Sequence, residues 1–356
     1  MTHNKYLILE SGDVFAGRSF GADAEAVGEV VFNTLMAGYL DTLTDARYCG
    51  QMVVQTFPLI GNYGVIPEET EGKKCYLSAY IAREICDEPS NFRCKGKLDS
   101  WLKAQGVVGI SGVDTRRLTK ILRDNGAMRA VITDSDKLTD DLRAAMESYR
   151  VADALEKTAV QPESIGDPDA KRHVVMVDFG ARGEGAQLLC ARGCRVTVLP
   201  YDATAKQILS YRPDAVVWTA GAGSPEDAGT QVAIVGEVLK HRVPVFAYGL
   251  GHQLLAMALG GKIVRLPYGH IGGQPVRDTQ TGKLLITTQN HGYCVDADKL
   301  PEGAVLRYVN VNDRSCEGLD YPERKALSVQ FMPTASGGPI ATDFLFDRLI
   351  AYMEEK

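Results

Sequence analysis

The segment Val243–Ala256 has the pattern of a strand that runs through a tight glycine turn into a helix. The turn has the form small-x-Gly-x-Gly, which is the shape of a nucleophile elbow. In an elbow the central residue takes a strained backbone conformation and presents its side chain at the helix N-terminus, where partial positive charge stabilises an anion. The central residue here is Gly249, so the sequence predicts an elbow that carries no nucleophile.

Two further glycine pairs, Gly221-Ala222-Gly223 and Gly272-Gly273, are interpreted as turns. A glycine pair alone is weak evidence for a ligand site, because many loops need glycine only for a positive φ angle. In a parallel sheet, however, ligands bind beyond the carboxyl ends of the strands, where such turns lie. We therefore expect the functional site at the edge that carries these turns.

Apolar runs alternate with helical patterns after residue 170, which predicts an α/β fold with a doubly wound parallel sheet. The runs expected to be buried strands are Val174–Phe179, Arg195–Leu199, Asp214–Thr219 and Val243–Ala247. The helices are expected at Gly185–Arg192, Glu226–Lys240, Gly251–Leu259 and Thr342–Met353. This arrangement would position the elbow and the first glycine pair at one edge of the sheet.

The first 150 residues show no clear strand–helix alternation. They mix a helical stretch at Thr115–Asp124 with short β-rich runs at Tyr6–Leu9, Val30–Asn33, Met52–Thr56 and Val107–Gly109. A polar stretch that ends at Gln161–Pro168 is typical of a linker. We predict a small N-terminal β-rich α+β domain at residues 1–150, a linker at 151–170 and the doubly wound domain at 171–356.

The composition is that of a globular protein, with 45% hydrophobic and 24% charged residues among 356. The net charge is −6 and no basic block is long enough to follow a phosphate backbone, which excludes nucleic acid as an expected partner. The apolar run near the N-terminus is too short for a signal peptide, and none approaches the roughly 18 residues of a membrane span. We expect a cytoplasmic protein with no membrane partner.

The eight cysteines are scattered without a CxxC pair, so we interpret them as reduced, mostly buried thiols. The sequence contains neither a metal-ligand cluster nor a Walker-type phosphate-binding motif, and we expect no metal and no cofactor. His252, His270 and His291 are the histidines near the predicted ligand edge. Each is interpreted as a packing residue, with a catalytic role as the alternative.

Three segments of the second half resemble the landmark segments of class I glutamine amidotransferases: His252-Gln253 after the elbow, Gln289–Tyr293 and Gln330–Ser336. The first half resembles the small subunit of carbamoyl phosphate synthase at Gly28–Thr34, Gly38-Tyr39, Leu43–Asp45, Pro58–Gly64 and Ser111–Thr119. The resemblance covers nearly the whole chain. It implies a class I glutamine amidotransferase-like fold for the second domain.

In that family the small subunit hydrolyses glutamine and passes ammonia to a large subunit, which makes carbamoyl phosphate for arginine and pyrimidine synthesis. The chemistry requires a Cys thiolate at the elbow, a His that transfers protons and a Glu that orients the His. The matching positions hold Gly249, Met332 and Thr334. The resemblance therefore predicts that all three catalytic groups are missing and that this chain does not hydrolyse glutamine.

The resemblance also implies a ligand pocket. The backbone of Gly221 and Leu250 would form the oxyanion hole, and the ligand contacts would be Gly223, Gln253, Asn290, Gly292 and Tyr293. Arg47 replaces a serine that contacts glutamine in family members. It either points inward as a cation for a small anionic metabolite or lies in solvent over a vacant site. The loss of the Cys and His side chains is expected to enlarge the cavity.

Two other thiols, Cys49 and Cys294, lie in segments that approach the glutamine pocket in the family. Neither has an obvious base, because Met332 is a poor proton acceptor, and both lack the elbow geometry. We interpret both as small buried hydrophobic residues rather than as replacement nucleophiles.

Three functions are open at this point. The first is a non-hydrolysing small subunit that docks on the large subunit of carbamoyl phosphate synthase, leaving that partner to use free ammonia. The second is a binding or regulatory module for a small anionic metabolite, and the third is a conventional glutamine-hydrolysing subunit. We predict the first and keep the other two as alternatives.

Overall fold

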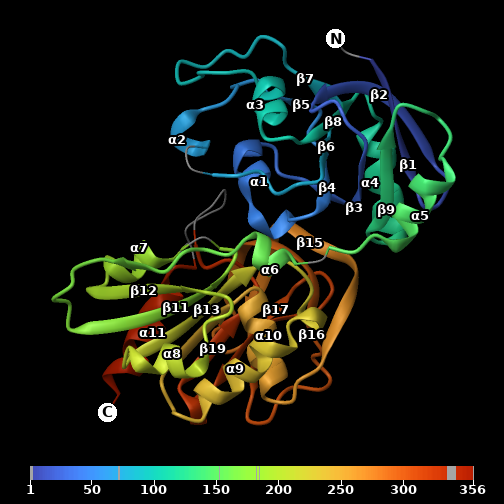
Figure 1. The fold of residues 1–356 in the computed structure, drawn as a ribbon. Coiled ribbons are helices and arrows are strands. Elements are labelled where there is room, and N and C mark those ends of the chain that lie inside the picture. Colours follow the sequence, from blue (N-terminus) through green and yellow to red (C-terminus); the bar gives the residue numbers. More distant parts are fainter. Residues whose placement is uncertain are drawn as a thin grey trace. The chain divides into compact units, whose positions relative to one another are not determined.

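The computed structural model describes residues 3–70, 73–151, 153–181, 183, 185–334 and 342–355. Its internal contacts divide the chain into two compact units (Figure 1). The barrel unit comprises Met1–Ala154 and Pro267–Gly269, and the sheet unit comprises Leu155–Leu266 and His270–Lys356. The domain limits expected from the sequence, 1–150 and 171–356, remain a prediction.

The barrel unit is built on a closed barrel of short strands. In barrel order these are β1 (Asn4–Leu9), β2 (Val14–Gly21), β8 (Val108–Ser111), β6 (Ala79–Ile81), β4 (Gln51–Gln55), β3 (Ala26–Asn33) and β9 (Met128–Thr133). A separate two-stranded sheet pairs β5 (Leu59–Ile60) with β7 (Glu84–Ile85). The helices are α1 (Tyr39–Thr44), η1 (Ala46–Tyr48), α2 (Pro67–Thr70), α3 (Leu98–Ala104), α4 (Thr115–Asn125) and α5 (Asp140–Ser148). The β-rich first half with limited helix is confirmed.

Both faces of strand β4 are buried in the barrel unit. Met52 and Val54 pack in one hydrophobic core with Leu118 of α4. Val53, which points to the opposite side, packs in a second core with Leu102 of α3. This division follows from the two-residue period of a strand, which sends successive side chains to opposite faces.

The sheet unit contains one ten-stranded sheet. In spatial order its strands are β10 (Glu163–Ile165), β12 (Cys194–Pro200), β11 (Arg172–Phe179), β13 (Ala215–Gly221), β14 (Val245–Tyr248), β19 (Ala326–Val329), β18 (Cys316–Tyr321), β16 (Leu284–Val295), β15 (Ile263–Asp278) and β17 (Val305–Asn310). Neighbouring strands pair in parallel along the series β12, β11, β13, β14 and β19. The remaining pairings are antiparallel.

Helices cover both faces of the parallel strands (Figure 1). They are α6 (Ala154–Lys157), α7 (Ala186–Cys190), α8 (Ala205–Ser210), α9 (Gly229–Leu239), α10 (Leu250–Ala258) and α11 (Phe344–Glu354). Two short helices, η2 (Pro225–Asp227) and η3 (Pro322–Arg324), lie in the connections between elements of this unit. Val175 of β11 shares a core with Leu254 of α10, whereas the next residue, Met176, shares the opposite core with Leu345 of α11. The doubly wound fold is therefore confirmed.

The strands and helices expected after residue 170 match β11 to β14, α7, α9, α10 and α11 within a few residues. The segment expected to be a linker, 151–170, contains α6 and β10, and β10 pairs with β12. The interpretation of Gly272-Gly273 as a turn is wrong, because both residues lie within β15 and pair with Gln289 and Thr288. Glycine and polar residues in this long strand interrupt the alternation by which a strand is recognised in sequence.

Candidate functional site

The elbow lies between β14, which ends at Tyr248, and α10, which begins at Leu250. Gly249 has φ 59° and ψ −121°. L-residues with a side chain rarely adopt this backbone conformation. Its N–H donates to the carbonyl of Val329 on the neighbouring strand β19, at 3.0 Å. The turn predicted from the sequence is therefore present, with glycine at its strained position.

Gly221 and the elbow lie at the same edge of the sheet, because β13 and β14 are adjacent parallel strands. Gly221 ends β13, and Gly223 follows with a φ of 87°. Leu250, whose N–H is predicted to complete the oxyanion hole with Gly221, is the first residue of α10 and is buried. The oxyanion-hole role of these residues remains a prediction.

Gln253 ties α10 to the strands on the antiparallel side of the sheet. Its amide nitrogen donates to the carbonyl of Tyr293 at 2.9 Å and to Oε1 of Gln330 at 3.0 Å. Asn290 and Gly292 lie on the same strand, β16, as Tyr293. The structure thus brings Gln253 against the Asn290–Tyr293 segment, as the predicted pocket requires, while their contacts with a ligand remain predictions.

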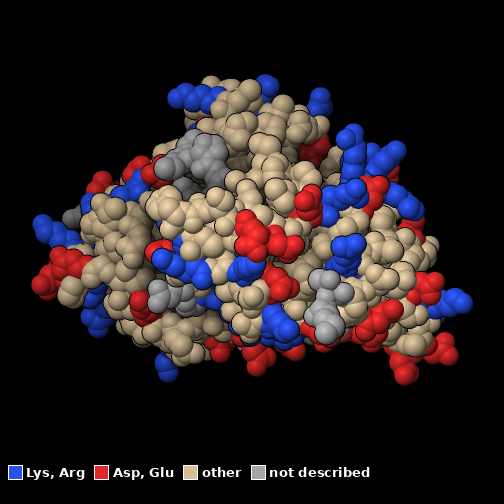
Figure 2. Space-filling view, turned by 90° about the horizontal axis from the view of Figure 1, so that it is seen from above, with Lys and Arg blue, Asp and Glu red and all other residues tan. Residues whose placement is uncertain are grey.

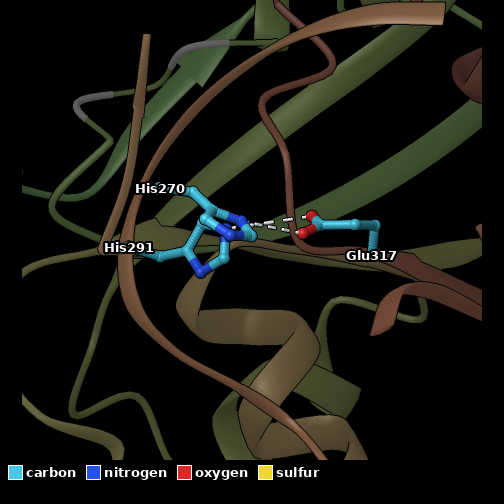
Figure 3. Close-up of side chains that lie close together, drawn as sticks. All are labelled: His270, His291 and Glu317. Carbon is cyan, nitrogen blue, oxygen red and sulfur yellow. Dashed lines mark hydrogen bonds and ion pairs between the residues drawn. The ribbon is translucent and has the colours of Figure 1, made fainter. Parts of the chain in front are cut away.

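Three potential metal ligands meet at this segment: His291 on β16, which belongs to it, His270 on β15 and Glu317 on β18 (Figure 3). We call these three residues the His–Glu cluster. Their donor atoms all lie within 4.8 Å of one another, and the three side chains are almost fully buried. The sequence offered no signal for this cluster, because its residues are far apart along the chain and form no ligand motif. Only the pairing of the antiparallel strands brings them together.

Charge on the His–Glu cluster is unevenly distributed. Burial lowers the pKa of His270, but the hydrogen bonds and charges of Glu317 and Asp313 outweigh burial and raise the pKa above its usual value. Burial lowers the pKa of His291 to about 4, against the opposing charge of Glu317. His291 is therefore neutral at pH 7.

His252 packs inside the sheet unit, as expected. Its side chain is fully buried in α10, and Nδ1 lies 2.7 Å from the hydroxyl of Ser328 on β19. The other ring nitrogen, Nε2, has no hydrogen-bond partner within the described residues. Burial lowers the pKa of His252 to about 3, so the ring is neutral at pH 7 and is a weak proton acceptor.

Cys294 follows the predicted pocket segment on β16 and is 3% exposed. Burial raises the pKa of its thiol to about 12, with help from the charge of Glu317. A thiol rather than a thiolate is present at pH 7, so the residue is a poor nucleophile. Cys49 is also buried, and both fit the interpretation as small hydrophobic residues.

Basic and acidic side chains are both spread over the surface drawn in Figure 2, with no basic stripe of the kind that follows a nucleic-acid backbone. Within the described residues, no helix is long and apolar enough to cross a membrane.

Family models match both halves of the chain. The model described as "Carbamoyl-phosphate synthase small chain, CPSase domain" matches residues 7–132, and the model described as "Glutamine amidotransferase class-I" matches residues 175–352. The chain belongs to the carbamoyl phosphate synthase small chain family. The class I amidotransferase fold expected for the second domain is thereby confirmed.

Relatives in this family align with nearly the whole length of this chain. The carbamoyl phosphate synthase small chain of Fusobacterium nucleatum is 42% identical over 351 residues, covering 98% of either chain. That of Clostridium perfringens is 41% identical, covering 97% of this chain and 98% of the relative. A solved structure, described as a glutamine amidotransferase from Thermotoga maritima, covers 52% of this chain and 83% of its own, at 20% identity and a TM-score of 0.38. That low similarity adds nothing to the assignment.

A side chain at the centre of the elbow in this carbamoyl phosphate synthase small chain homologue would press against the neighbouring strand β13. A Cβ atom at position 249 would lie 2.5 Å from Cβ and 2.8 Å from Cα of Ala220 on β13. Real Cβ contacts are essentially never below 3.0 Å. The expectation that missing side chains enlarge the cavity is wrong at this position, because Ala220 occupies the space.

The other two positions matched to the family triad follow β19. Met332 is 3% exposed, pairs with Thr288 through its N–H at 2.9 Å, and packs in the core that contains Phe331. Thr334 is half-buried and ends the described part of the Gln330–Ser336 segment, whose last two residues lie outside the described residues. A thioether at position 332 cannot act as a general base.

Arg47 does not lie out in solvent. It belongs to η1 in the barrel unit, and its guanidinium pairs with Asp45 through Nε at 2.8 and 3.0 Å and through Nη2 at 2.7 Å. The Arg47 side chain is only 13% exposed. Asp45 compensates the charge of Arg47. This pairing argues against Arg47 as an additional cation for an anionic metabolite. A ligand contact by Arg47 remains a prediction.

Proposed function

We propose that this chain is a small subunit of carbamoyl phosphate synthase that does not hydrolyse glutamine and that docks on an ammonia-using large subunit. The observation that carries the proposal is Gly249 at the elbow, in a backbone conformation where Ala220 fills the place of a side chain. Family membership over the whole length supports the docking role.

Glutamine hydrolysis by this family's chemistry needs a thiolate, a proton carrier beside it and a group that orients the carrier. The nearby groups cannot replace them. Cys294 is a protonated thiol on β16 rather than at the centre of the elbow, and burial makes His252 a weak proton acceptor by lowering its pKa to about 3. Catalytic residues that act as a unit fail together. We therefore expect the rate of glutamine hydrolysis to be lower by several orders of magnitude, rather than partly reduced.

A conventional glutamine-hydrolysing subunit is the second candidate. The observation that favours it is the 42% identity, over almost the entire length, to a chain named carbamoyl phosphate synthase small chain. On this alternative the chain supplies ammonia from glutamine by a route that does not use an elbow thiol. Overall similarity supports both candidates equally, and the elbow residues favour the first.

The nitrogen source distinguishes the two candidates. The experiment purifies the complex of this chain with its large subunit, then measures carbamoyl phosphate formed from amide-labelled [15N]glutamine or from [15N]ammonium. We expect label from ammonium only, and no glutamate release from glutamine. A matched complex, built with a family member that has Cys, His and Glu at the three positions, should accept both sources. Glutamine-derived label in the first complex would establish the conventional function instead.

A further inference from the structure

The His–Glu cluster has the donor set of a transition-metal site. His270 Nδ1 lies 3.1 Å from Glu317 Oε1, and His291 Nε2 lies 3.8 Å from Glu317 Oε2 (Figure 3). A fourth donor, Oε1 of Gln289, lies 3.0 Å from His270 Nδ1 and 3.0 Å from His291 Nε2. We propose that these four side chains bind one divalent transition-metal ion of the zinc class.

The separations between the donor atoms are near those of a tetrahedral site, and the donors of His270, His291 and Glu317 all lie within 4.8 Å of one another. Zinc binds nitrogen and oxygen donors at about 2.0–2.2 Å, which places tetrahedral donors about 3.3–3.6 Å apart. Four of the separations between the donors of this site are 3.0, 3.0, 3.1 and 3.8 Å. Small side-chain rotations, chiefly of the two rings, would close the set around an ion.

Each histidine is hydrogen-bonded through the ring nitrogen that points away from the cluster, so its other ring nitrogen faces Glu317 and Gln289. His291 Nδ1 lies 2.9 Å from the Tyr293 carbonyl, which only accepts, so Nδ1 carries the hydrogen and the Nε2 lone pair faces the cluster. His270 Nε2 lies 2.8 Å from the carboxylate of Asp313, which leaves Nδ1 on the inner side. Metal-binding histidines are held in this way by a carboxylate or a carbonyl on the outer nitrogen.

Gln289 turns its side-chain oxygen toward both histidines. Gln289 donates through Nε2 to Thr287 Oγ1 at 3.0 Å and to Glu317 Oε2 at 2.9 Å, which fixes its Oε1 toward the histidines. That oxygen then lies 3.0 Å from His270 Nδ1 and 3.0 Å from His291 Nε2. Its position between the two inner ring nitrogens is that of a further ligand to an ion bound by both rings.

The donor set selects the class of ion. Two imidazoles with one carboxylate and one amide oxygen suit Zn²⁺, Co²⁺ and similar ions, whereas Mg²⁺ and Ca²⁺ prefer oxygen donors alone. Four protein ligands in a buried site leave no open position for a substrate. The ion would therefore crosslink β15, β16 and β18 and hold the strand that carries Asn290, Gly292 and Tyr293.

The test uses the full chain after treatment with a chelator. Zn²⁺ affinity is measured in competition with a chromophoric chelator, and Co²⁺ serves as a spectroscopic probe. We expect one ion per chain, the visible absorption of tetrahedral cobalt without a thiolate charge-transfer band, and a higher melting temperature with Zn²⁺ but not with Mg²⁺. Glu317→Gln should abolish stoichiometric binding, and Asp313→Asn should weaken it about 10–100-fold.

The matched control is His173→Gln. His173 is also buried with both ring nitrogens in hydrogen-bond contact, with the Tyr211 carbonyl and Thr197 Oγ1, but it lies on β11. This variant should keep full affinity. If Glu317→Gln does not fold, Asp313→Asn supplies the same comparison at a partly exposed position. Absence of stoichiometric binding, unchanged affinity in the cluster variants, or a thiolate band that places the ion on cysteines would overturn the proposal.

Discussion

Gly249 is the residue on which the catalytic prediction depends. Gly249→Cys puts a side chain at a φ of 59° and 2.5 Å from Cβ of Ala220, so we expect a loss of about 1–3 kcal/mol in the free energy of unfolding. We also expect no glutaminase activity, because Met332 cannot serve as the base. Chemical denaturation and glutamate release measure the two effects. The double variant with Ala220→Gly is the control and should recover part of the lost stability.

Restoring the chemistry requires more than the thiol. With Met332→His and Thr334→Glu added to Gly249→Cys, we expect a covalent thiol ester with a glutamine analogue, detected by mass spectrometry of the intact chain. The reason is that the nucleophile, the proton carrier and its orienting group act as a unit. An acyl adduct in Gly249→Cys alone, or in the unaltered chain, would contradict this account.

His252 makes stability depend on pH. The unfolded chain binds a proton at this histidine near its ordinary pKa of 6.5, but in the folded protein burial lowers the pKa to about 3. The unfolded state therefore binds more protons as the pH falls below 6.5, and stability is lost. From about pH 7 to pH 5 this single group should reduce the free energy of unfolding by about 2 kcal/mol.

Denaturation curves at both pH values, for the unaltered chain and for His252→Gln, measure this contribution. The variant should show a pH dependence smaller by that amount. His241→Gln, at an exposed position, is the control and should keep the original dependence. An unchanged slope in His252→Gln would show that His252 is not the group responsible.

At the scale of the elements, α10 lies so close to β13 that only glycine fits at the contact. A Cβ atom on Gly251 would lie 2.4 Å from the carbonyl oxygen of Trp218, and backbone cannot move aside cheaply. Gly251→Ala should therefore lower the melting temperature and displace the N-terminus of the helix that follows the elbow. We expect the free energy of unfolding to fall by about 1–3 kcal/mol, measured by chemical denaturation.

Gly236 on α9 is the matched control. An added Cβ there meets only Ala258 Cβ, at 3.9 Å, and glycine inside a helix is less favourable than alanine. Gly236→Ala should stabilise the protein by about 0.5–1 kcal/mol. Equal effects of the two substitutions would show that helix propensity, rather than the approach of α10 to β13, determines the result.

At the scale of the whole molecule, family models match both units, whereas the three positions of the predicted triad, 249, 332 and 334, all lie in the sheet unit. Docking should therefore be independent of the elbow. We expect the unaltered chain and the triple variant Gly249→Cys, Met332→His, Thr334→Glu to co-elute equally with a carbamoyl phosphate synthase large subunit in gel filtration. Failure of both to co-elute would favour the stand-alone binding module.

Local patterns in the sequence were sufficient for four of the five parallel strands, and β19 (Ala326–Val329) was not predicted. Buried runs of Val and other apolar residues bounded by Gly or Pro predicted β11 to β14, and the periodic segments between them predicted α7, α9 and α10. The antiparallel strands β15 to β18 were not predicted, because their polar and glycine residues hide the alternation. The residues that surround the predicted pocket lie partly on these strands, so their mutual contacts could not be derived from sequence.

The sequence by itself determined that an elbow exists, that glycine occupies it and that the other two matched positions hold Met332 and Thr334, because these are properties of short consecutive segments. Only the tertiary structure decided that Ala220 fills the elbow, that Arg47 is paired with Asp45, and that His270, His291 and Glu317 meet. Apart from the Arg47–Asp45 pair, whose geometry depends on a local turn, these contacts join residues far apart in the chain. Such contacts follow from strand order and register, which no single segment encodes.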